Sequence, residues 1–290
     1  MPLPPDLPIV DHHCHLSPNG EGVEAARRFA HAGGTHLFLA TQQYGPNVPL
    51  SIDAYRTQFE TTEQLANRIR AEVGAIPYLV VAPYPVDLIR ASAEVGLETA
   101  RAVQEGALDL AGRWVEDQRA VAIGEVGRPH FPVEPPIVEA AEQVFRHALE
   151  VARDVGCPAV VHSEDLTPEG YRALAEFAGR VSFPPHQLVK HYARVVTPAA
   201  ARLGIAPSYV ARRELVDAAL REPGPWFLET DFLDDPRRPG AVLDLATVPR
   251  RAQTLLSNDP TLADRLRVPF SDSIESVYGF RPVPIENARP

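Results

Sequence analysis

The chain has 290 residues, of which 45% are hydrophobic and 23% are charged, and its formal net charge at pH 7 is −10. This length fits a one-domain barrel, and no tract has the biased composition of a disordered segment. The acidic balance disfavours an extended nucleic acid as partner, because such binding depends on lysine and arginine that neutralise phosphates. We therefore expect one domain over residues 1–290 that acts on a small molecule.

The sequence carries no signal for a membrane or for export. No run reaches the ~18–20 uncharged apolar residues that a membrane span needs, and the first residues lack the basic and then apolar order of a signal peptide. The two cysteines, Cys14 and Cys157, lie far apart within strand-like segments, so we expect buried thiols and no disulfide. These features predict a cytoplasmic protein without a membrane span. The oligomeric state is left open.

Eight short apolar runs predict strands, which in chain order span residues 7–16, 35–41, 76–85, 120–127, 158–164, 186–192, 204–210 and 225–232. Helical spacing between these runs predicts helices over residues 22–34, 62–74, 136–156 and 169–181, several of which end at glycine. Alternating strands and helices indicate parallel pairing with right-handed crossovers. Eight such repeats predict closure into a (β/α)8 barrel.

Two segments between the predicted strands differ from the rest, the long connection before the fourth strand and a proline-containing segment after the second. Residues 86–119 have the pattern of one or two helices. Residues 42–53 contain two prolines and show no clear periodicity. In a barrel the second segment would lie on the catalytic face, so it is a candidate lid or specificity loop.

Potential metal ligands gather at the predicted C-terminal ends of the strands, which is the face where barrel enzymes build their active sites. They are His13 and His15 on the first strand, Glu125 on the fourth, His162 on the fifth, His191 on the sixth and Asp231 on the eighth. Side chains at positions i and i+2 of a strand project to the same side. His13 and His15 can therefore share one cation, while His12 points elsewhere.

Imidazole and carboxylate ligands suit divalent ions such as Zn, Mn, Ni or Mg. Two such ions about 3.5–4 Å apart would activate a bridging water and hold the oxygens of a scissile ester or amide. Glu125 is the natural bridge between them, and Asp231 is the natural general base. We predict these two as catalytic residues of a hydrolase with two metal ions.

Each piece of this pattern also has a simpler interpretation. An isolated HxH motif is more often coincidence than a site, and Glu125 after a glycine can be a charge at the barrel end. The joint placement of six ligand-type residues at strand ends favours the metal site. The remaining histidines fall outside this pattern and are predicted to be structural or exposed; they include His31, His36, His147 and His186.

The segments DHHCHL, GEVGRPHF, VVHSED, VKHY and ETDFLDDP resemble the TatD-type branch of the amidohydrolase superfamily, and most closely its largely uncharacterised archaeal-type subgroup. The resemblance runs from Val10 to Tyr278. It implies a metal-dependent hydrolase on a distorted TIM barrel. It further implies one metal on His13, His15, Glu125 and Asp231, and another on Glu125, His162 and His191.

The chain departs from the nuclease pattern of that branch near the site. TatD nucleases usually carry GEIGLD after the fourth strand and an arginine after the fifth-strand histidine, where this chain has GEVGRPH and HSE. Glu164 thus places negative charge where the nuclease pattern has positive charge. Arg128 and His130 bring new polar groups toward Glu125 and are predicted to bind substrate. This favours a small substrate over inherited DNase activity.

Other polar residues near the site receive narrower roles. Arg237 and Arg238, like Arg128, suit a substrate carboxylate or phosphate, although both fit an exposed surface equally well. Asp234 and Asp235 are expected to cap a loop. Lys190 is the only lysine, and because it neighbours His191 on a strand we expect it to face the helix layer or a loop carboxylate, without carboxylation.

Three functions remain open at this point. The leading one is hydrolysis of a small ester, phosphoester or amide by a water that two metals activate. A second keeps the barrel but uses one metal for deamination, lactone opening or decarboxylation. The third is a metal-stabilised scaffold or binding protein without catalysis.

Overall fold

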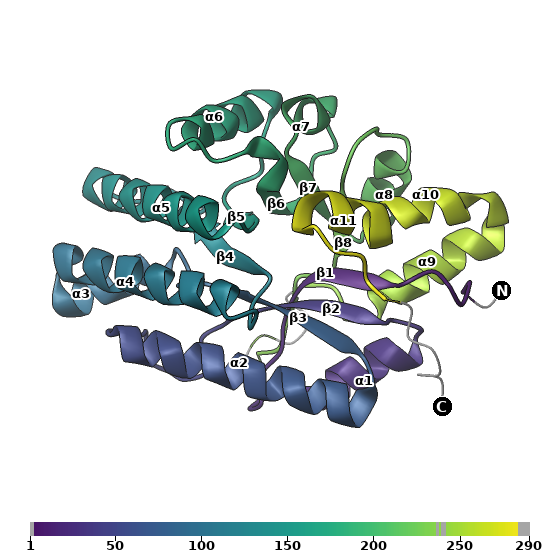
Figure 1. The fold of residues 1–290 in the computed structure, drawn as a ribbon, viewed down its shortest axis with the longest axis horizontal. Helices are drawn as coiled ribbons and strands as arrows, with labels where there is room; N and C mark the ends of the chain where they lie inside the picture. The colour runs from purple at the N-terminus through teal and green to yellow at the C-terminus, as the bar shows by residue number, and fades with distance from the viewer. Residues whose placement is uncertain (1–2, 236–237, 239–241, 284–290) are drawn as a thin grey trace.

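The computed structural model describes residues 3–235, 238 and 242–283, and this part of the chain forms one parallel sheet surrounded by helices (Figure 1). The strands lie in the order β8-β7-β6-β5-β4-β3-β2-β1-β9. Their bounds are β1 Val10–His15, β2 His36–Ala40, β3 Ile76–Val81, β4 Ala122–Gly127, β5 Ala159–His162, β6 Leu188–Ala193, β7 Ala206–Val210, β8 Phe227–Glu229 and β9 Phe232–Leu233. The eight predicted strands are therefore present, and the last one is split in two.

The two edges of this sheet belong to one short piece of chain, which closes the barrel. β8 pairs with β7 at one edge, and β9 pairs with β1 at the other. Between them the backbone N–H of Asp231 donates a hydrogen bond of 2.9 Å to the carbonyl of His13. The predicted (β/α)8 barrel is confirmed, with a distortion at the break between β8 and β9.

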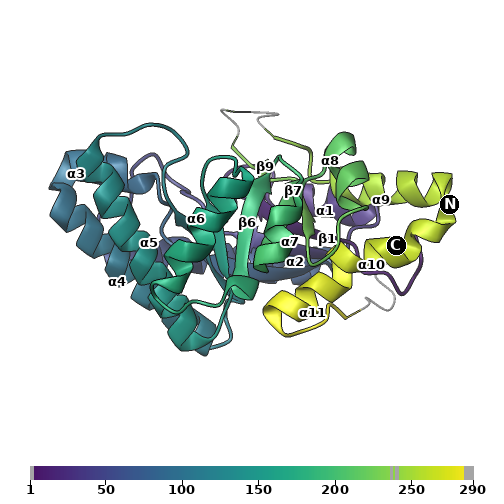
Figure 2. The same ribbon diagram turned by 90° about the horizontal axis from the view of Figure 1, so that it is seen from above.

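Helices cover the outside of the barrel (Figure 2). Their bounds are α1 Val23–His31, α2 Ile52–Val73, α3 Asp87–Val95, α4 Leu97–Glu116, α5 Pro135–Val155, α6 Pro168–Gly179, α7 Pro198–Leu203, α8 Arg213–Ala219, α9 Thr247–Asn258, α10 Ala263–Arg267 and α11 Ser273–Tyr278, with short helical turns at Pro185–Gln187, Pro260–Leu262 and Val268–Asp272. No helix among the described residues is both long and apolar enough to cross a membrane.

The helix predicted over residues 62–74 begins earlier than expected. Its first residue is Ile52, because Ser51 adopts an extended conformation and its side chain accepts a hydrogen bond from the backbone N–H of Ala54, as helix N-caps do. The irregular segment that was a candidate lid thus ends at Ser51. The connection over residues 86–119 forms two helices, α3 and α4, which are separated at Gly96.

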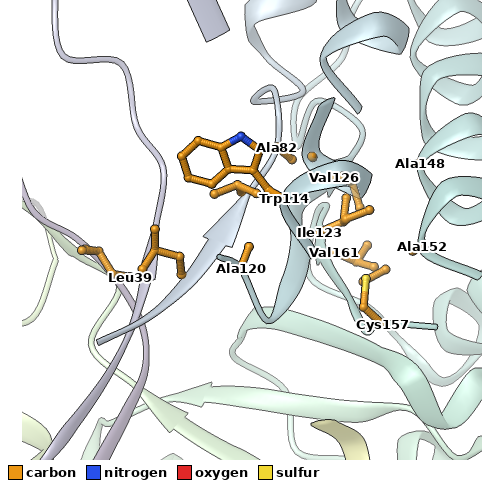
Figure 3. Close-up of a cluster of buried hydrophobic side chains, with 14 of the residues drawn as sticks. Leu39, Ala82, Trp114, Ala120, Ile123, Val126, Ala148, Ala152, Cys157 and Val161 are labelled. Atoms are coloured by element: carbon orange, nitrogen blue, oxygen red, sulfur yellow. The ribbon is translucent and has the colours of Figure 1, made fainter. Parts of the chain in front are cut away.

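Strand residues alternate between two apolar layers. In β2, Leu37 and Leu39 face the helices, whereas Phe38 faces the inside of the barrel, as the two-residue period of a strand requires. Figure 3 shows part of the outer layer, including Trp114 of α4. Cys14 and Cys157 are both buried free thiols, as expected.

Gly127 at the end of β4 permits a close approach to β5. Its φ is +133°, and a Cβ atom at this position would lie 2.1 Å from the carbonyl oxygen of His162. A side chain here would force β4 and β5 apart beside a candidate ligand. The approach therefore depends on glycine.

We expect Gly127→Ala to lower the free energy of unfolding by more than about 1 kcal/mol, because the new methyl group meets backbone and the φ is strained for alanine. Denaturant titration measures this change. Gly179→Ala is the matched control, since a Cβ there would have no described atom within 4 Å. Equal stability of both variants would contradict the argument.

Candidate metal centre

The structure brings the six predicted ligands together, with Glu125 in contact with all four histidines. Oxygen Oε1 of Glu125 lies 3.1 Å from Nε2 of His13 and 3.0 Å from Nε2 of His15. Oxygen Oε2 lies 2.7 Å from Nδ1 of His162 and 3.1 Å from Nε2 of His191. Each carboxylate oxygen thus faces its own pair of histidines.

Asp231 completes the first of these two groups. Its Oδ1 lies 3.6 Å from Nε2 of His15 and 3.9 Å from Nε2 of His13. The residue has a φ of +49° and occupies the break between β8 and β9, where the chain turns its side chain toward the barrel mouth. With 19% of its side chain exposed, it is the most accessible of the six.

Irregularities in three strands coincide with the ligands. The register shifts between Asp11 and Cys14 in β1, between Gly124 and Val126 in β4, and between Lys190 and Ala193 in β6. The intervals enclose His13, Glu125 and His191. Bulges of this kind redirect side chains, and they are common beside active sites.

Burial and mutual contact set the charges of the cluster. Burial raises the pKa of Glu125, but the surrounding histidines outweigh this effect and hold it well below its usual range. Burial lowers the pKa of His13 and of His162. Burial acts in the same direction on His15, but the carboxylates of Asp231 and Glu125 prevail and raise its pKa to about 10. The bridge is thus ionised, and His13 and His162 are held neutral, which is the state that metal ligands require, whereas His15 must lose a proton when an ion binds.

The spacing of the donor atoms fits divalent cations. Within each group, His13, His15 and Asp231 or Glu125, His162 and His191, one donor atom per residue lies within 4.8 Å of the others. Nitrogen donors 3.0–3.2 Å apart, as in the pairs His13–His15 and His162–His191, match two ligands that each lie about 2.1 Å from one ion. Four imidazoles on one carboxylate is a donor set for borderline divalent metals.

Glu229 was not among the predicted site residues, although the structure places it directly behind the cluster. Its side chain is fully buried, and Oε1 accepts a hydrogen bond of 2.6 Å from the backbone N–H of Tyr192 and lies 3.6 Å from Nδ1 of His191. Glu229, His13 and His191 form a third close group. The signal in the sequence was its position two residues before Asp231, a spacing that places both side chains near one strand end.

Asp11 is a second buried carboxyl group that was missed. It accepts hydrogen bonds from the backbone N–H of His13 and from both the backbone and the hydroxyl of Thr230. These contacts join β1 to the break after β8. Asp11 therefore fixes the two chain segments that bring His13 and Asp231 together.

A cleft of about 620 Å³ opens above the cluster. Both long connections contribute to it, through Gln43 of the segment before α2 and through Asp87 and Arg90 of α3. Arg90 links the two, because it donates to the side chain of Gln43 at 2.8 Å and to the carbonyl of Pro46 at 3.2 Å. The two segments thus form one wall of the cleft.

The two predicted substrate-binding residues have different surroundings. His130 lines the cleft, and its Nδ1 lies 2.8 Å from Nε2 of His162, where the hydroxyl of Tyr84 also approaches to 3.4 Å. Arg128 instead pairs with Glu164 through two contacts of 2.5 and 3.2 Å and lines a smaller cavity beside α5 and α6. The negative charge of Glu164 is therefore balanced by Arg128.

The remaining polar residues near the site are placed as follows. Asp234 caps the loop after β1, as expected, by accepting hydrogen bonds from the backbone N–H groups of Ser17, Glu21 and Gly22. Asp235 and Arg238 line the cleft, whereas Arg237 lies outside the described residues.

Lys190 is buried, and it donates to the carbonyls of Ser163 and His191. We expected Lys190 to face the helix layer or a loop carboxylate, but the acceptors of these two hydrogen bonds are backbone oxygens. Through these bonds Lys190 ties the ends of β5 and β6 together.

The histidines outside the ligand set have ordinary surroundings. The ring of His12 stacks on Phe227 at 3.8 Å and contacts the hydroxyl of Tyr278. His36 is buried at the start of β2 and contacts the hydroxyl of Thr35, and His147 pairs with Asp109 on the surface.

The family model described as TatD related DNase matches residues 10–279. The chain belongs to this family. An uncharacterised protein of Methanocaldococcus jannaschii is 30% identical over 279 residues, which are 94% of this chain and 96% of the relative. Two solved structures share the fold. A TatD family hydrolase of Entamoeba histolytica aligns with a TM-score of 0.63 and 12% identity over 94% of this chain and 99% of its own. The TatD homologue YJJV of Escherichia coli gives a TM-score of 0.59 and 18% identity over 94% and 98%.

These matches confirm the resemblance that the sequence motifs indicated, including the link to an uncharacterised archaeal protein. Membership in the TatD family, together with the clusters of histidine and carboxylate ligands, supports a metal-dependent hydrolase in general terms. At 12% and 18% identity, the two solved structures show the shared fold alone.

A substitution of Glu229 tests the metal site without changing any of the six candidate ligands. We expect Glu229→Gln to weaken the affinity for divalent metal about 10- to 100-fold, because a carboxylate behind a ligating imidazole fixes its orientation and raises its basicity. Competition with a chelator of known affinity measures the change. Glu139→Gln on the exposed surface of α5 is the control. Unchanged affinity in Glu229→Gln would remove this role.

Proposed function

We propose that the chain is a hydrolase that holds two divalent metal ions and cleaves a small ester, phosphoester or amide. One metal group consists of His13, His15 and Asp231, and the other of His162 and His191, with Glu125 between them. The ions suited to these ligands are Zn, Mn, Ni or Mg. Asp231 and Glu125 are the proposed catalytic residues.

One observation supports this proposal above the others: a single carboxylate, Glu125, meets two pairs of histidines through separate oxygens. A site for one metal needs only one of these pairs. Both pairs are held on the same carboxylate by strands from different parts of the chain, which favours a centre with two ions over the mononuclear alternative. The scaffold alternative requires neither the open cleft nor the accessible Asp231.

Two divalent cations in this site would supply Lewis acidity and lower the pKa of the attacking water. The chain's own residues do the rest. Asp231 faces the cleft beside His15, at a place where it can accept a proton from that water. His130 contacts the outer nitrogen of His162 and so holds this imidazole with its Nδ1 toward Glu125.

The cleft suits a small substrate. Its volume of about 620 Å³ lies in the range of pockets that enclose small molecules. The chain's net charge of −10 opposes the approach of a long polyanion. Glu164 further contributes a carboxylate at the cleft wall, although Arg128 balances it. We therefore favour a small molecule over an extended nucleic acid.

Metal content per chain is the first test. We expect close to two divalent ions in protein purified without chelator, and we expect Glu125→Gln to lose both together, because both groups depend on its carboxylate. Elemental analysis measures this. The matched control is Glu164→Gln, which changes a carboxylate of the cleft wall outside the ligand set. One ion per chain, retained in Glu125→Gln, would favour the mononuclear alternative.

Turnover is the second test, on a panel of phosphoesters, carboxyesters and amides. We expect the metal-loaded protein to cleave at least one class, and we expect chelator to abolish this activity and added metal to restore it. Asp231→Asn should retain at least one metal while turnover falls about 100-fold or more, as loss of a general base implies. Unchanged turnover in Asp231→Asn would exclude its catalytic role.

A further inference from the structure

Three arginines line the cleft, and they differ in how their charges are balanced. They are Arg90 from α3, Arg194 after β6, and Arg238 from the loop after β9. Arg194 pairs with Asp165 at 2.7 Å. For Arg90 and Arg238, the described part of the chain offers no carboxylate within 4.0 Å. The cleft therefore contains two cationic groups without an ion-pair partner among the described residues.

The guanidinium of Arg90 is held in place by neutral groups. It donates through Nη1 to the side-chain oxygen of Gln43 and through Nη2 to the carbonyl of Pro46. A guanidinium has five N–H donors in a rigid plane, so these contacts leave donors available toward the cleft. Arg90 is thus oriented by the segment before α2, while its charge stays unneutralised.

The nearest acidic group on the same helix offsets the charge of Arg90 only in part. Asp87 precedes Arg90 by one helical turn and also lines the cleft. Burial raises the pKa of Asp87 to about 7, against the opposing effect of Arg90. Asp87 is therefore only partly ionised near neutral pH. The hydroxyl of Tyr84, farther along the same wall, remains neutral because burial raises its pKa.

Two of the rim acids are balanced as well, and a third acid, Asp235, also lines the cleft. Glu164 pairs with Arg128, and Asp165 pairs with Arg194. Arg90 and Arg238 are thus the cleft-lining basic side chains without an ion-pair partner among the described residues. Arg90 makes its hydrogen bonds to the wall segment, and none of the described hydrogen bonds joins it to the six candidate ligands.

We propose that Arg90, together with Arg238, recognises an anionic group of a small substrate, a carboxylate or a phosphate, at a distance from the bond that is cleaved. This proposal rests on the proposed function and names its substrate class. An arginine fork matches either anion with paired hydrogen bonds. The long-range repulsion of the acidic chain disfavours polyanions but leaves room for a single compact anion.

Binding of simple dicarboxylates tests the proposal without requiring turnover. Linear dicarboxylates of three to six carbons are titrated calorimetrically into the metal-loaded protein and compared with monocarboxylates of equal length. At the matching length, we expect the dicarboxylate to bind about tenfold more tightly or better, the scale of a charge-assisted pair. Phosphonocarboxylates of the same lengths form a second arm, and the tighter series identifies the anion.

Variants separate recognition from support of the cleft wall. Arg90→Gln should abolish the preference for the second charge and retain the metal content. Gln43→Ala removes the neutral contact but keeps the charge, so it should retain most of the preference. Arg202→Gln on α7, outside the cleft, is the matched control. Equal affinity for both series in the native protein, or equal loss in Gln43→Ala and Arg90→Gln, would overturn the proposal.

The binding test of the recognition site and the turnover test of the proposed hydrolase can fail independently of each other. Preference for dicarboxylates without turnover of any ester, phosphoester or amide would support the recognition site and count against hydrolysis of these classes. Turnover of uncharged esters, with no preference for a second charge in the native protein, would support hydrolysis and overturn the role of Arg90.

Discussion

The structure depends on one buried carboxylate. Glu125 is 5% exposed, and burial of an ionised group without partners is strongly unfavourable. Its two oxygens are instead enclosed by four imidazoles from β1, β5 and β6. Strands far apart in the sequence must therefore end at the same point in space. A barrel meets this requirement, because the C-terminal ends of all its parallel strands share one face.

The same constraint explains where the barrel departs from regularity. A strict two-residue alternation directs every second side chain outward, whereas the site needs its ligands at particular angles to Glu125. The strands shift register where β1, β4 and β6 carry ligands, and the last strand breaks at Asp231. Buried side-chain contacts compensate for the lost pairing. Asp11 joins β1 to Thr230, and Lys190 ties β6 to the end of β5.

Sequence reasoning located the candidate ligands because their signal is local. Apolar runs show where the strands end, and a histidine or carboxylate at such an end can be recognised without knowledge of the packing. Side-chain direction is not visible in this way. Arg128 lies only three residues after Glu125 in the sequence. Gly127, which stands between them, has a φ of +133°, and the side chain of Arg128 contacts Glu164. Glu229 was missed because its contact with Tyr192 runs from β8 to β6 past the intervening β7, and the sequence pattern does not show such a contact.

Helix starts and loop contacts were equally hidden from the sequence pattern. The early start of α2 depends on the side chain of Ser51, which caps the helix. The apolar spacing over the next ten residues is too weak to predict this start from the sequence. Its consequence reaches the cleft. The short loop before α2 is held by Arg90 of α3. The loop and the helix, which the sequence pattern shows only as separate segments, therefore form one wall of the cleft.

The charge of the molecule is organised on two scales. Over the whole chain, acidic residues outnumber basic ones by ten, and this excess acts over a Debye length to repel large polyanions. Within the cleft, Glu164 and Asp165 are paired and Asp87 is partly protonated, whereas Arg90 and Arg238 have no carboxylate within 4.0 Å among the described residues. A compact anion that enters the cleft interacts mainly with the arginines, whereas a long polyanion must also contact the acidic surface outside the cleft. The same sequence can thus belong to a family whose model is described as TatD related DNase, while the charges of its cleft support the proposal of a small, singly anchored substrate.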